Sequence, residues 1–305
     1  MKAWLVRAWL VIGLALFVYV LTRTPFAEIE TSIAAMGPWV IVSPSIAALW
    51  FATRTSALGV VLGGGVPWRE LYVLRWIGDG YNGILPLAGV GGEPFKLRIL
   101  DRYLSTEAAL TGLVRDRLID NGLGFIVSAG FAALGIAMLG DPPGHRGLMI
   151  YAAIAVPVGI ALLALMITRA PGKLGAFAAR LAAGTHTEPQ PLPRRALVRA
   201  LAWFALTRML QASETTLLLH LVGLPTDLGT ILFVDGALNA AGFVGFVMPQ
   251  GLGVVESAAV FALTGLGATL PVATAFALVR RGRVVTCGVV ALILHAVSGA
   301  NKLAR

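Results

Sequence analysis

The stretch 81-YNGILPLAGVGGEPFKLRIL-100 decides how the whole chain is interpreted. An asparagine, a proline and four glycines interrupt an apolar run, and Glu93 and Lys96 follow that run at once. The apolar part, 81–92, is too short to cross a membrane, because a spanning helix needs about 20 residues. The stretch is therefore a soluble phosphate loop, a linker, or a helix that is broken inside a membrane.

The composition indicates a membrane protein. The chain has 305 residues, of which 57% are hydrophobic and 13% are charged, and its mean hydropathy is +0.83. Soluble domains carry roughly 25% charged residues. Charge-free runs of 18 to 23 residues lie at 31–53, 121–140, 147–168, 236–255, 257–279 and 284–301. We therefore expect an all-α, polytopic membrane protein.

The distribution of charge predicts the topology. About six full spans are expected, at 3–22, 33–53, 121–140, 148–168, 197–222 and 271–300. With the N-terminus in the cytoplasm, 18 of the 24 basic residues fall in the cytoplasmic segments 1–7, 54–120, 169–199 and the C-terminus. Only Arg23 and Arg146 fall in outside loops. This asymmetry predicts that both termini are cytoplasmic.

Two segments of this topology, 3–22 and 169–196, need further interpretation. The segment 3–22 resembles a signal peptide in charge, but no small-residue cleavage site follows it, so a retained first helix is preferred. The segment 169–196 is polar and rich in proline, which predicts a cytoplasmic linker. One transmembrane domain, 1–305, would then consist of a first half at about 1–168 and a second half at about 197–305.

A second interrupted stretch, 235-DGALNAAGFVGFVMPQGLGVVESA-258, shares features with the first. In each stretch, a glutamate follows a proline by seven residues. The predicted topology makes the first hairpin open from the inside and the second from the outside, as in inverted-repeat transporters. The residues expected to break the helices are Pro86, Gly91, Gly92, Pro249, Gly251 and Gly253.

Two alternatives to paired re-entrant hairpins stay open. The stretches could be glycine-rich loops that are similar by chance, or 236–255 and 257–279 could be full spans, which makes eight spans. A nucleotide site is not expected, because 89-GVGG-92 does not match GxGxxG and follows no strand.

Charged residues inside apolar regions are the candidate functional residues, because intramembrane charges cost free energy. Glu93 and Lys96, three residues apart, share a helix face and form either an interfacial ion pair or part of a site. Glu256 is the one charge within 236–279, which favours a functional role.

Two further groups have alternative interpretations. Asp116, Arg117 and Asp120 belong either to a solvated helix entry or to a docked polar network. The arginines of 280-RRGR-283 form either an outer loop or a set of cations that line a cavity for phosphate or carboxylate. Arg208, Glu214 and Asp235 are weaker candidates, and Arg208 and Glu214 are expected to pair within their own half.

No catalytic or metal-binding motif is visible. The single cysteine, Cys287, and four scattered histidines show no metal-ligand spacing, and HExxH, GxSxG and Walker motifs are absent. We therefore expect no enzyme activity and no cofactor. The net charge of +9 is better explained by cytoplasmic loops facing anionic lipid than by nucleic-acid binding.

At these residues the sequence resembles a flippase-like integral membrane family that includes the transmembrane domain of lysylphosphatidylglycerol synthase and hopanoid-biosynthesis-associated membrane proteins. The resemblance covers about 75–290. The matching motifs are N82-x3-P86-x4-G91-G92-E93-x2-K96, 116-DRLID-120, 249-PQGLGVVE-256 and the arginines of 280–283.

The resemblance implies two inverted repeats with re-entrant helices and movement of a lipid between leaflets. It also implies that Glu93, Asp116, Arg117, Asp120, Glu256 and Arg281 are functional polar residues. The chain departs from the family at Gln250, where a second glycine is common, and at Arg115, an extra cation that points to a different headgroup. Without a soluble aminoacyl-transferase domain, the chain is not expected to make aminoacylated lipid.

The predicted function is translocation, without ATP, of a lipid with a polar or charged headgroup. Alternatives are an integral membrane enzyme acting on lipid and a non-transporting accessory subunit of lipid synthesis. Expected partners are membrane lipid and a lipid-synthesis enzyme, with no nucleic acid, in a bacterial cytoplasmic (inner) membrane. The candidate substrate-binding residues are Asn82, Glu93, Lys96, Asp116, Arg117, Asp120, Glu256, Arg280, Arg281 and Arg283.

Overall fold

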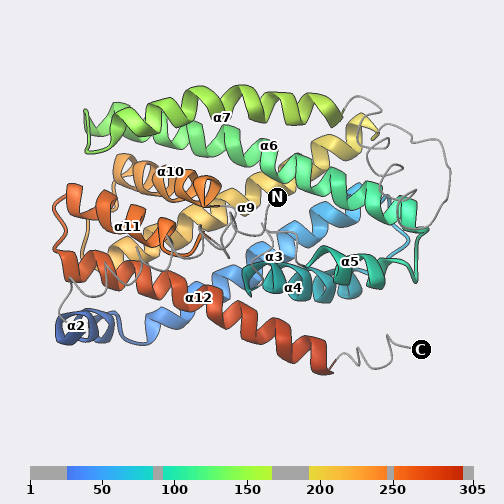
Figure 1. The fold of residues 1–305 in the computed structure, drawn as a ribbon, viewed down its shortest axis with the longest axis horizontal. Helices are drawn as coiled ribbons and strands as arrows, with labels where there is room; N and C mark the ends of the chain where they lie inside the picture. Colours follow the sequence, from blue (N-terminus) through green and yellow to red (C-terminus); the bar gives the residue numbers. More distant parts are fainter. Residues whose placement is uncertain (1–25, 85–91, 167–191, 246–250, 298–305) are drawn as a thin grey trace, which may run out of the picture.

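The computed structural model describes residues 26–84, 92–166, 192–245 and 251–297 (Figure 1). Within these ranges every regular element is a helix, so the all-α prediction is confirmed. The predicted span 3–22 and most of the predicted linker 169–196 lie outside them. The elements are α2 (Phe26–Met36), a 3₁₀ turn (Gly37–Ile41), α3 (Val42–Val61), α4 (Trp68–Ile84), α5 (Glu93–Leu100), α6 (Thr106–Leu139), α7 (His145–Met166), α9 (Arg194–Leu221), α10 (Leu228–Val244), α11 (Val254–Gly265) and α12 (Leu270–Val297).

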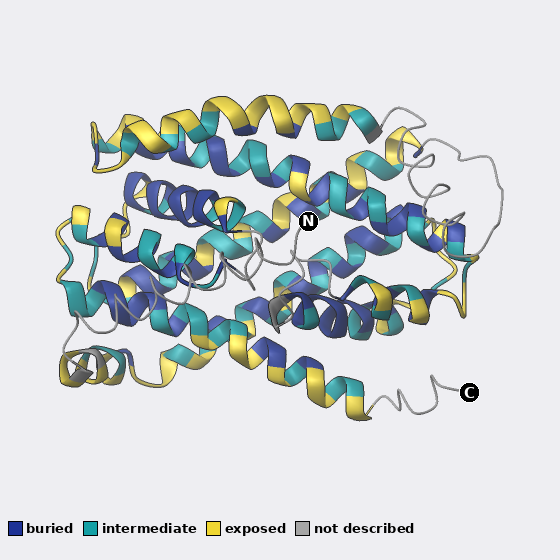
Figure 2. Ribbon diagram, in the orientation of Figure 1, coloured by how far each residue is buried: buried dark blue, intermediate teal, exposed yellow. Residues whose placement is uncertain are grey.

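Several of these helices are long enough to cross a membrane. Three continuous helical stretches are also strongly apolar, at 30–61 (the end of α2, the 3₁₀ turn and α3), 106–139 and 145–165. Helices α9 and α12 have 28 residues each but carry charges near mid-length. The outer face of α7 is exposed along its length (Figure 2) and presents large apolar side chains, including Ile150, Ile154 and Ile160. A contiguous apolar surface of this kind suits lipid, so the chain is a multi-pass membrane protein.

Local sequence signals account for the helix starts. The Ser105 hydroxyl accepts a hydrogen bond from the Ala108 amide at the start of α6. Asp227 caps α10 in the same way, and hydrogen bonds from the Thr230 hydroxyl and amide lower the pKa of its carboxyl group. Both residue types are preferred caps, because a side-chain oxygen satisfies an otherwise unpaired backbone donor.

Both predicted breaks interrupt helices. Helix α4 ends at Ile84 and α5 begins at Glu93, whereas α10 ends at Val244 and α11 begins at Val254. The eight-span alternative is therefore wrong, because neither 236–255 nor 257–279 is one helix. Pro86, Gly91 and Pro249 lie outside the described residues.

The described break glycines have physical reasons to be glycine. Gly251 and Gly253 have φ angles of 64° and 81°. Residues that carry a Cβ atom rarely adopt this backbone conformation, whereas glycine adopts it readily. Gly92 has an ordinary φ, but a Cβ there would collide with the carbonyl of Gly78 on α4. The second break thus needs glycine for backbone conformation, and the first needs it for close approach.

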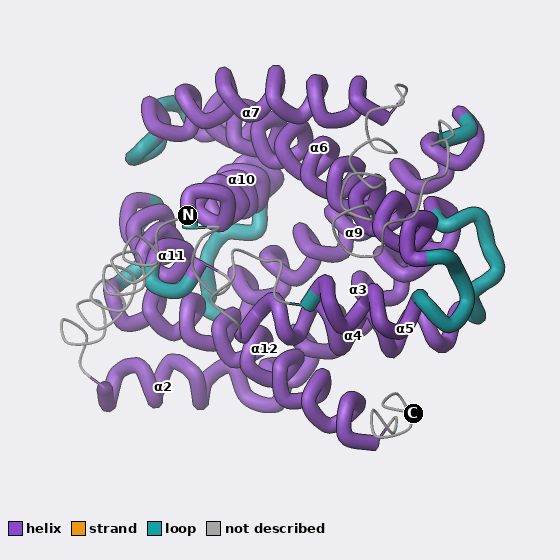
Figure 3. The backbone as a smooth tube through the Cα atoms, turned by 45° about the vertical axis from the view of Figure 1, so that its right-hand side comes forward, coloured by secondary structure: helices purple, strands orange, loops and turns teal. Residues whose placement is uncertain are grey.

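Helices that are far apart in the sequence pack against one another. Helix α3 packs along α9, α4 against α12, and α6 against both α7 and α10 (Figures 1 and 3). A Cβ on Gly135 of α6 would collide with the backbone of Phe233, and one on Gly236 of α10 would collide with Ala132. The backbones of α6 and α10 are therefore in direct contact, a common arrangement of small residues in membrane helices.

We expect Gly135→Ala to destabilise the protein by about 1–3 kcal/mol, because the added methyl group forces α10 away from α6. The matched control is Gly130→Ala, since a Cβ at Gly130 of the same helix meets nothing within 4 Å. Thermal unfolding in detergent would measure both variants. Equal melting temperatures would contradict the close contact of α6 and α10.

Candidate functional site

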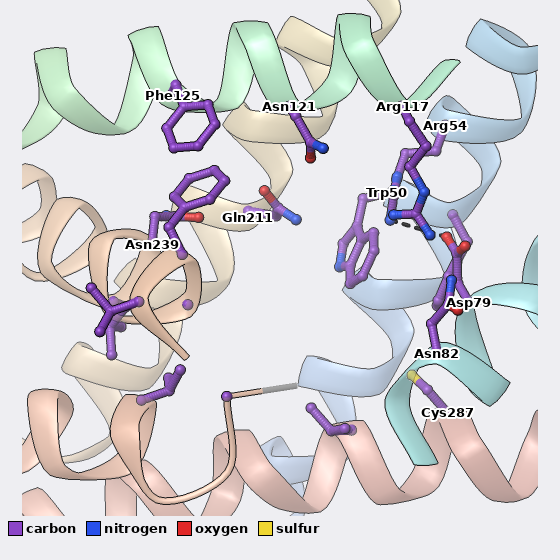
Figure 4. A pocket seen from close by; sticks show the side chains of 18 of the residues that line it. Trp50, Arg54, Asp79, Asn82, Arg117, Asn121, Phe125, Gln211, Asn239 and Cys287 are labelled. Carbon is purple, nitrogen blue, oxygen red and sulfur yellow. Dashed lines mark ion pairs between the residues drawn. The ribbon is translucent and has the colours of Figure 1, made fainter. Parts of the chain in front are cut away.

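A cavity of about 1310 Å³ lies between the two halves of the chain. Helices from α3 to α12 line it, and Figure 4 shows Arg54, Asp79 and Asn82 on one side and Gln211 and Asn239 on another. Described residues that flank both breaks contribute to its wall, among them Asn82, Glu93, Val244 and Gly251. Among the described lining residues are five arginines and four carboxylates, which are Arg54, Arg117, Arg280, Arg281, Arg283, Asp79, Glu93, Asp235 and Glu256.

A first ion network is centred on α4 and α6. Its buried core is Arg75 of α4, whose guanidinium donates two hydrogen bonds of 2.9 Å to the two carboxylate oxygens of Asp116. Both side chains are almost fully buried, and Arg75 also donates to the Arg54 carbonyl at 2.9 Å. This bidentate pair fixes α6 against α4.

Asp79 extends this network toward the first break. Its two carboxylate oxygens lie 2.7 Å from Lys96 Nζ and 3.0 Å from the Arg54 guanidinium. Lys96 also pairs with Glu93 at 3.1 Å, and Arg117 pairs with Glu93 at 2.7 Å. The first turn of α5 is thus held between α4 and α6 by charge.

Asp120 joins the first network to the second half of the chain. One carboxylate oxygen lies 2.6 Å from the Arg54 guanidinium of α3, and the other lies 2.7 Å from that of Arg208 on α9. Three helices therefore meet at one buried carboxylate.

A second ion network involves α9, α11 and α12. Glu214 accepts hydrogen bonds from Arg283 at 2.6 Å and from the Ser43 hydroxyl at 2.5 Å. Glu256 pairs with Arg281 at 3.4 Å and accepts a 2.7 Å hydrogen bond from the Gly253 amide at the second break. Glu256 therefore caps α11 while facing the cavity.

Asp235 and Arg280 form a looser part of the second network. Asp235 accepts hydrogen bonds from Thr215 at 3.0 Å and Asn239 at 2.9 Å. Arg280 donates to the same Thr215 hydroxyl at 3.5 Å. The threonine thus lies between a carboxylate and a guanidinium that make no ion pair with each other within 4.0 Å.

Trp50 of α3 lies between the two networks. The guanidinium carbons of Arg54 and Arg283 are 5.9 Å and 5.6 Å from its ring centre. Both distances allow cation–π attraction. The indole therefore lies close to one arginine from each network.

The cavity offers unused hydrogen-bonding atoms. In the described part of the chain, Trp50 Nε1, Asn82 Nδ2 and Glu93 Oε2 are buried and have no hydrogen-bond partner. Such atoms are rare in folded proteins, so they are available to a polar ligand or to water. No cluster of three or more His, Cys, Asp or Glu side chains suited to a metal occurs among the residues described.

The structure resolves the alternatives left open for several charged residues. Glu93 and Lys96 pair as predicted, with the Lys96 side chain 1% exposed and the Glu93 side chain 22% exposed. Asp116 and Asp120 are docked inside the protein and not at a solvated helix entry. The arginines of 280–283 lie in the middle of α12, so the outer-loop alternative is wrong.

The pairing predicted for the weaker candidates is half right. Glu214 pairs with Arg283 in its own half, as expected. Arg208 instead pairs with Asp120 of the first half, so that prediction is wrong. Asn82, predicted to bind substrate, accepts a 2.7 Å hydrogen bond from the Gly92 amide and so also braces the first break. Whether the predicted site residues bind substrate stays a prediction.

Sequence reasoning missed Arg54, Arg75 and Asp79. It placed all three in 54–120, which was treated as a cytoplasmic segment. The side chains of Arg54, Arg75, Lys96 and Arg117 form ion pairs inside the helix assembly, so these four residues have a structural role that the count of basic residues did not consider. The available signal was Arg75 and Asp79 four residues apart in a largely apolar helix, 68-WRELYVLRWIGDGYNGI-84.

Comparison with known proteins gives one family. The profile of the family described as "Lysylphosphatidylglycerol synthase TM region" matches residues 6–293. Comparisons with curated proteins and with solved structures gave no significant match.

We expect Asp120→Asn to destabilise the fold by about 3 kcal/mol or more, because it leaves Arg54 and Arg208 without their shared buried counter-charge. Asp141→Asn is the matched control, since the Asp141 side chain is 87% exposed. Thermal unfolding of both variants measures the difference. A change in Asp120→Asn no larger than that in the control would refute the structural role of this carboxylate.

Proposed function

We propose that this chain, which belongs to the lysylphosphatidylglycerol synthase TM region family, moves a lipid with a polar or charged headgroup between the two leaflets of a membrane. The observation that carries the proposal is a large cavity that both broken helix pairs line with charged side chains. In a membrane protein, ionisable residues around such a cavity are the usual mark of a substrate pathway.

The cavity has the mixed character that an amphiphile requires. Its charged wall contains members of both ion networks, whereas α7 contributes Ile154, Ala155 and Val158. Ile154 and Val158 also belong to the exposed apolar face of α7. A headgroup would enter among the charges while the acyl chains stay beside this apolar edge, in contact with the bilayer.

The two broken helix pairs support a transporter mechanism. We interpret α4–α5 and α10–α11 as re-entrant hairpins of two inverted repeats, with the substrate held between them. Each second helix carries a glutamate in its first turn, Glu93 in α5 and Glu256 in α11. Alternating access would exchange the ion pairs that these residues make, since a ligand shifts a conformational equilibrium only through differential contacts.

The proposal includes no ATP and no covalent step. The sequence contains no Walker motif, so movement would be passive or coupled to a gradient. A bacterial cytoplasmic membrane, cytoplasmic termini, the division into two halves of one domain and a lipid-synthesis enzyme as partner stay predictions.

We expect Glu256→Gln and Arg281→Ala each to abolish leaflet exchange, because each removes one member of the pair that lines the cavity at the second break. Glutamine keeps the size of Glu256 and an oxygen that can accept the Gly253 amide, so the fold should survive. The measurement is exchange of fluorescent lipids between leaflets of liposomes that contain the purified protein.

Glu28→Gln is the control, since Glu28 is exposed on α2 and does not line the cavity. Unchanged exchange in both cavity variants would reject the site. Absence of exchange in the folded wild-type protein with every headgroup tested would reject translocation and favour an enzyme acting on lipid or an accessory subunit. Conversion of a labelled lipid into a new product would identify the enzyme.

A further inference from the structure

The charges around the cavity do not balance. The two ion networks together contain eight cations and seven carboxylates. They are Arg54, Arg75, Lys96, Arg117, Arg208, Arg280, Arg281, Arg283, Asp79, Glu93, Asp116, Asp120, Glu214, Asp235 and Glu256. One positive charge is therefore in excess, and protonation of any carboxylate would enlarge this excess.

The sequence outside the described ranges contains a single acidic side chain that could offset this excess. The two breaks, 85–91 and 246–250, contain no ionisable side chain. Of the 15 acidic residues in the chain, only Glu188 falls outside the described ranges, and it belongs to the predicted linker. The sequence thus provides no carboxylate side chain at either break that could neutralise the extra cation.

Arg280 is the cation that best accounts for the excess. Arg54, Arg117, Arg281 and Arg283, the other described arginines that line the cavity, each have a carboxylate within 4.0 Å. Arg280 has none at that distance among the described residues, and its hydrogen bond to Thr215 is long. An excess positive charge inside a membrane protein is costly, so a ligand of opposite charge would bind there favourably.

We propose that the cavity binds a lipid of net negative charge and that Arg280 holds its phosphate group. This inference rests on the proposed function and adds the charge class of its substrate. A guanidinium matches phosphate oxygens with two parallel hydrogen bonds. A phosphodiester with one negative charge brings the networks to neutrality, whereas a cationic aminoacyl headgroup increases the excess to two.

The test measures binding separately from transport. The melting temperature of the purified protein in detergent is followed with added phosphatidylglycerol, phosphatidylcholine or lysylphosphatidylglycerol. Soluble glycerol 3-phosphate distinguishes a free phosphate from a lipid. We expect phosphatidylglycerol to stabilise the protein most and glycerol 3-phosphate to stabilise it little, since the phosphate alone lacks the acyl chains.

Three variants make the assignment specific. Arg280→Gln should weaken the apparent affinity for phosphatidylglycerol roughly tenfold or more, as expected for loss of a charged hydrogen-bond donor. Arg280→Lys should bind with intermediate affinity, because it keeps the charge but not the bidentate geometry. Arg69→Gln is the control, since Arg69 is exposed at the start of α4 and lies outside the cavity.

Equal stabilisation by all three lipids, unchanged affinity in Arg280→Gln, or equal stabilisation by glycerol 3-phosphate would overturn the inference. Its failure and that of the proposed function are distinguishable. If phosphatidylglycerol binds through Arg280 but no lipid changes leaflet, the inference stands and translocation fails. If lipids change leaflet without any preference for charge, translocation stands and the inference fails.

Discussion

The structure depends on one constraint, which is that a charge inside a membrane protein needs an opposite charge beside it. Asp120 shows how the chain satisfies it. Its two carboxylate oxygens pair with Arg54 of α3 and Arg208 of α9, so one side chain of α6 joins three helices and both halves of the chain. Such charges cannot be separated without leaving an uncompensated ion in apolar surroundings. The same electrostatics that fix the fold therefore build the polar wall of the cavity.

The helix breaks follow from the same constraint. Unpaired backbone groups at membrane depth are tolerated only where protein or a polar cavity surrounds them. Glu93 begins α5 and Glu256 lies in the first turn of α11, where a negative charge interacts favourably with the helix dipole. Arginines on α6 and α12 then compensate these glutamates through direct ion pairs. Each break is thus stabilised by a charge that also faces the place where substrate is proposed to bind.

The sequence predicted the structural features that depend on residues close together in the chain, and it did not predict those that depend on distant residues. The breaks before Glu93 and Glu256, the helical fold and the pairing of Glu93 with Lys96 follow from glycine, proline and helical spacing over short distances, and the structure confirms them. The partners of Asp120 and Asp116 could not be predicted, since Arg208 and Arg75 are 88 and 41 residues away. Counting charges as topological signals also concealed Arg75, because a buried arginine and a loop arginine look the same in a sequence.

The contacts between the halves differ in how easily they can change. Helices α6 and α10 touch through glycines, with backbone against backbone, and such a close contact cannot slide without collision. The contact of Glu214 with Ser43 instead joins side chains, and Glu214 has a second polar partner in Arg283. Trp50 lies near an arginine from each network, so movement of either arginine would change its cation–π contact with the indole. We therefore expect a headgroup that enters the cavity to exchange ion pairs around Trp50 while the packing of α6 on α10 stays fixed.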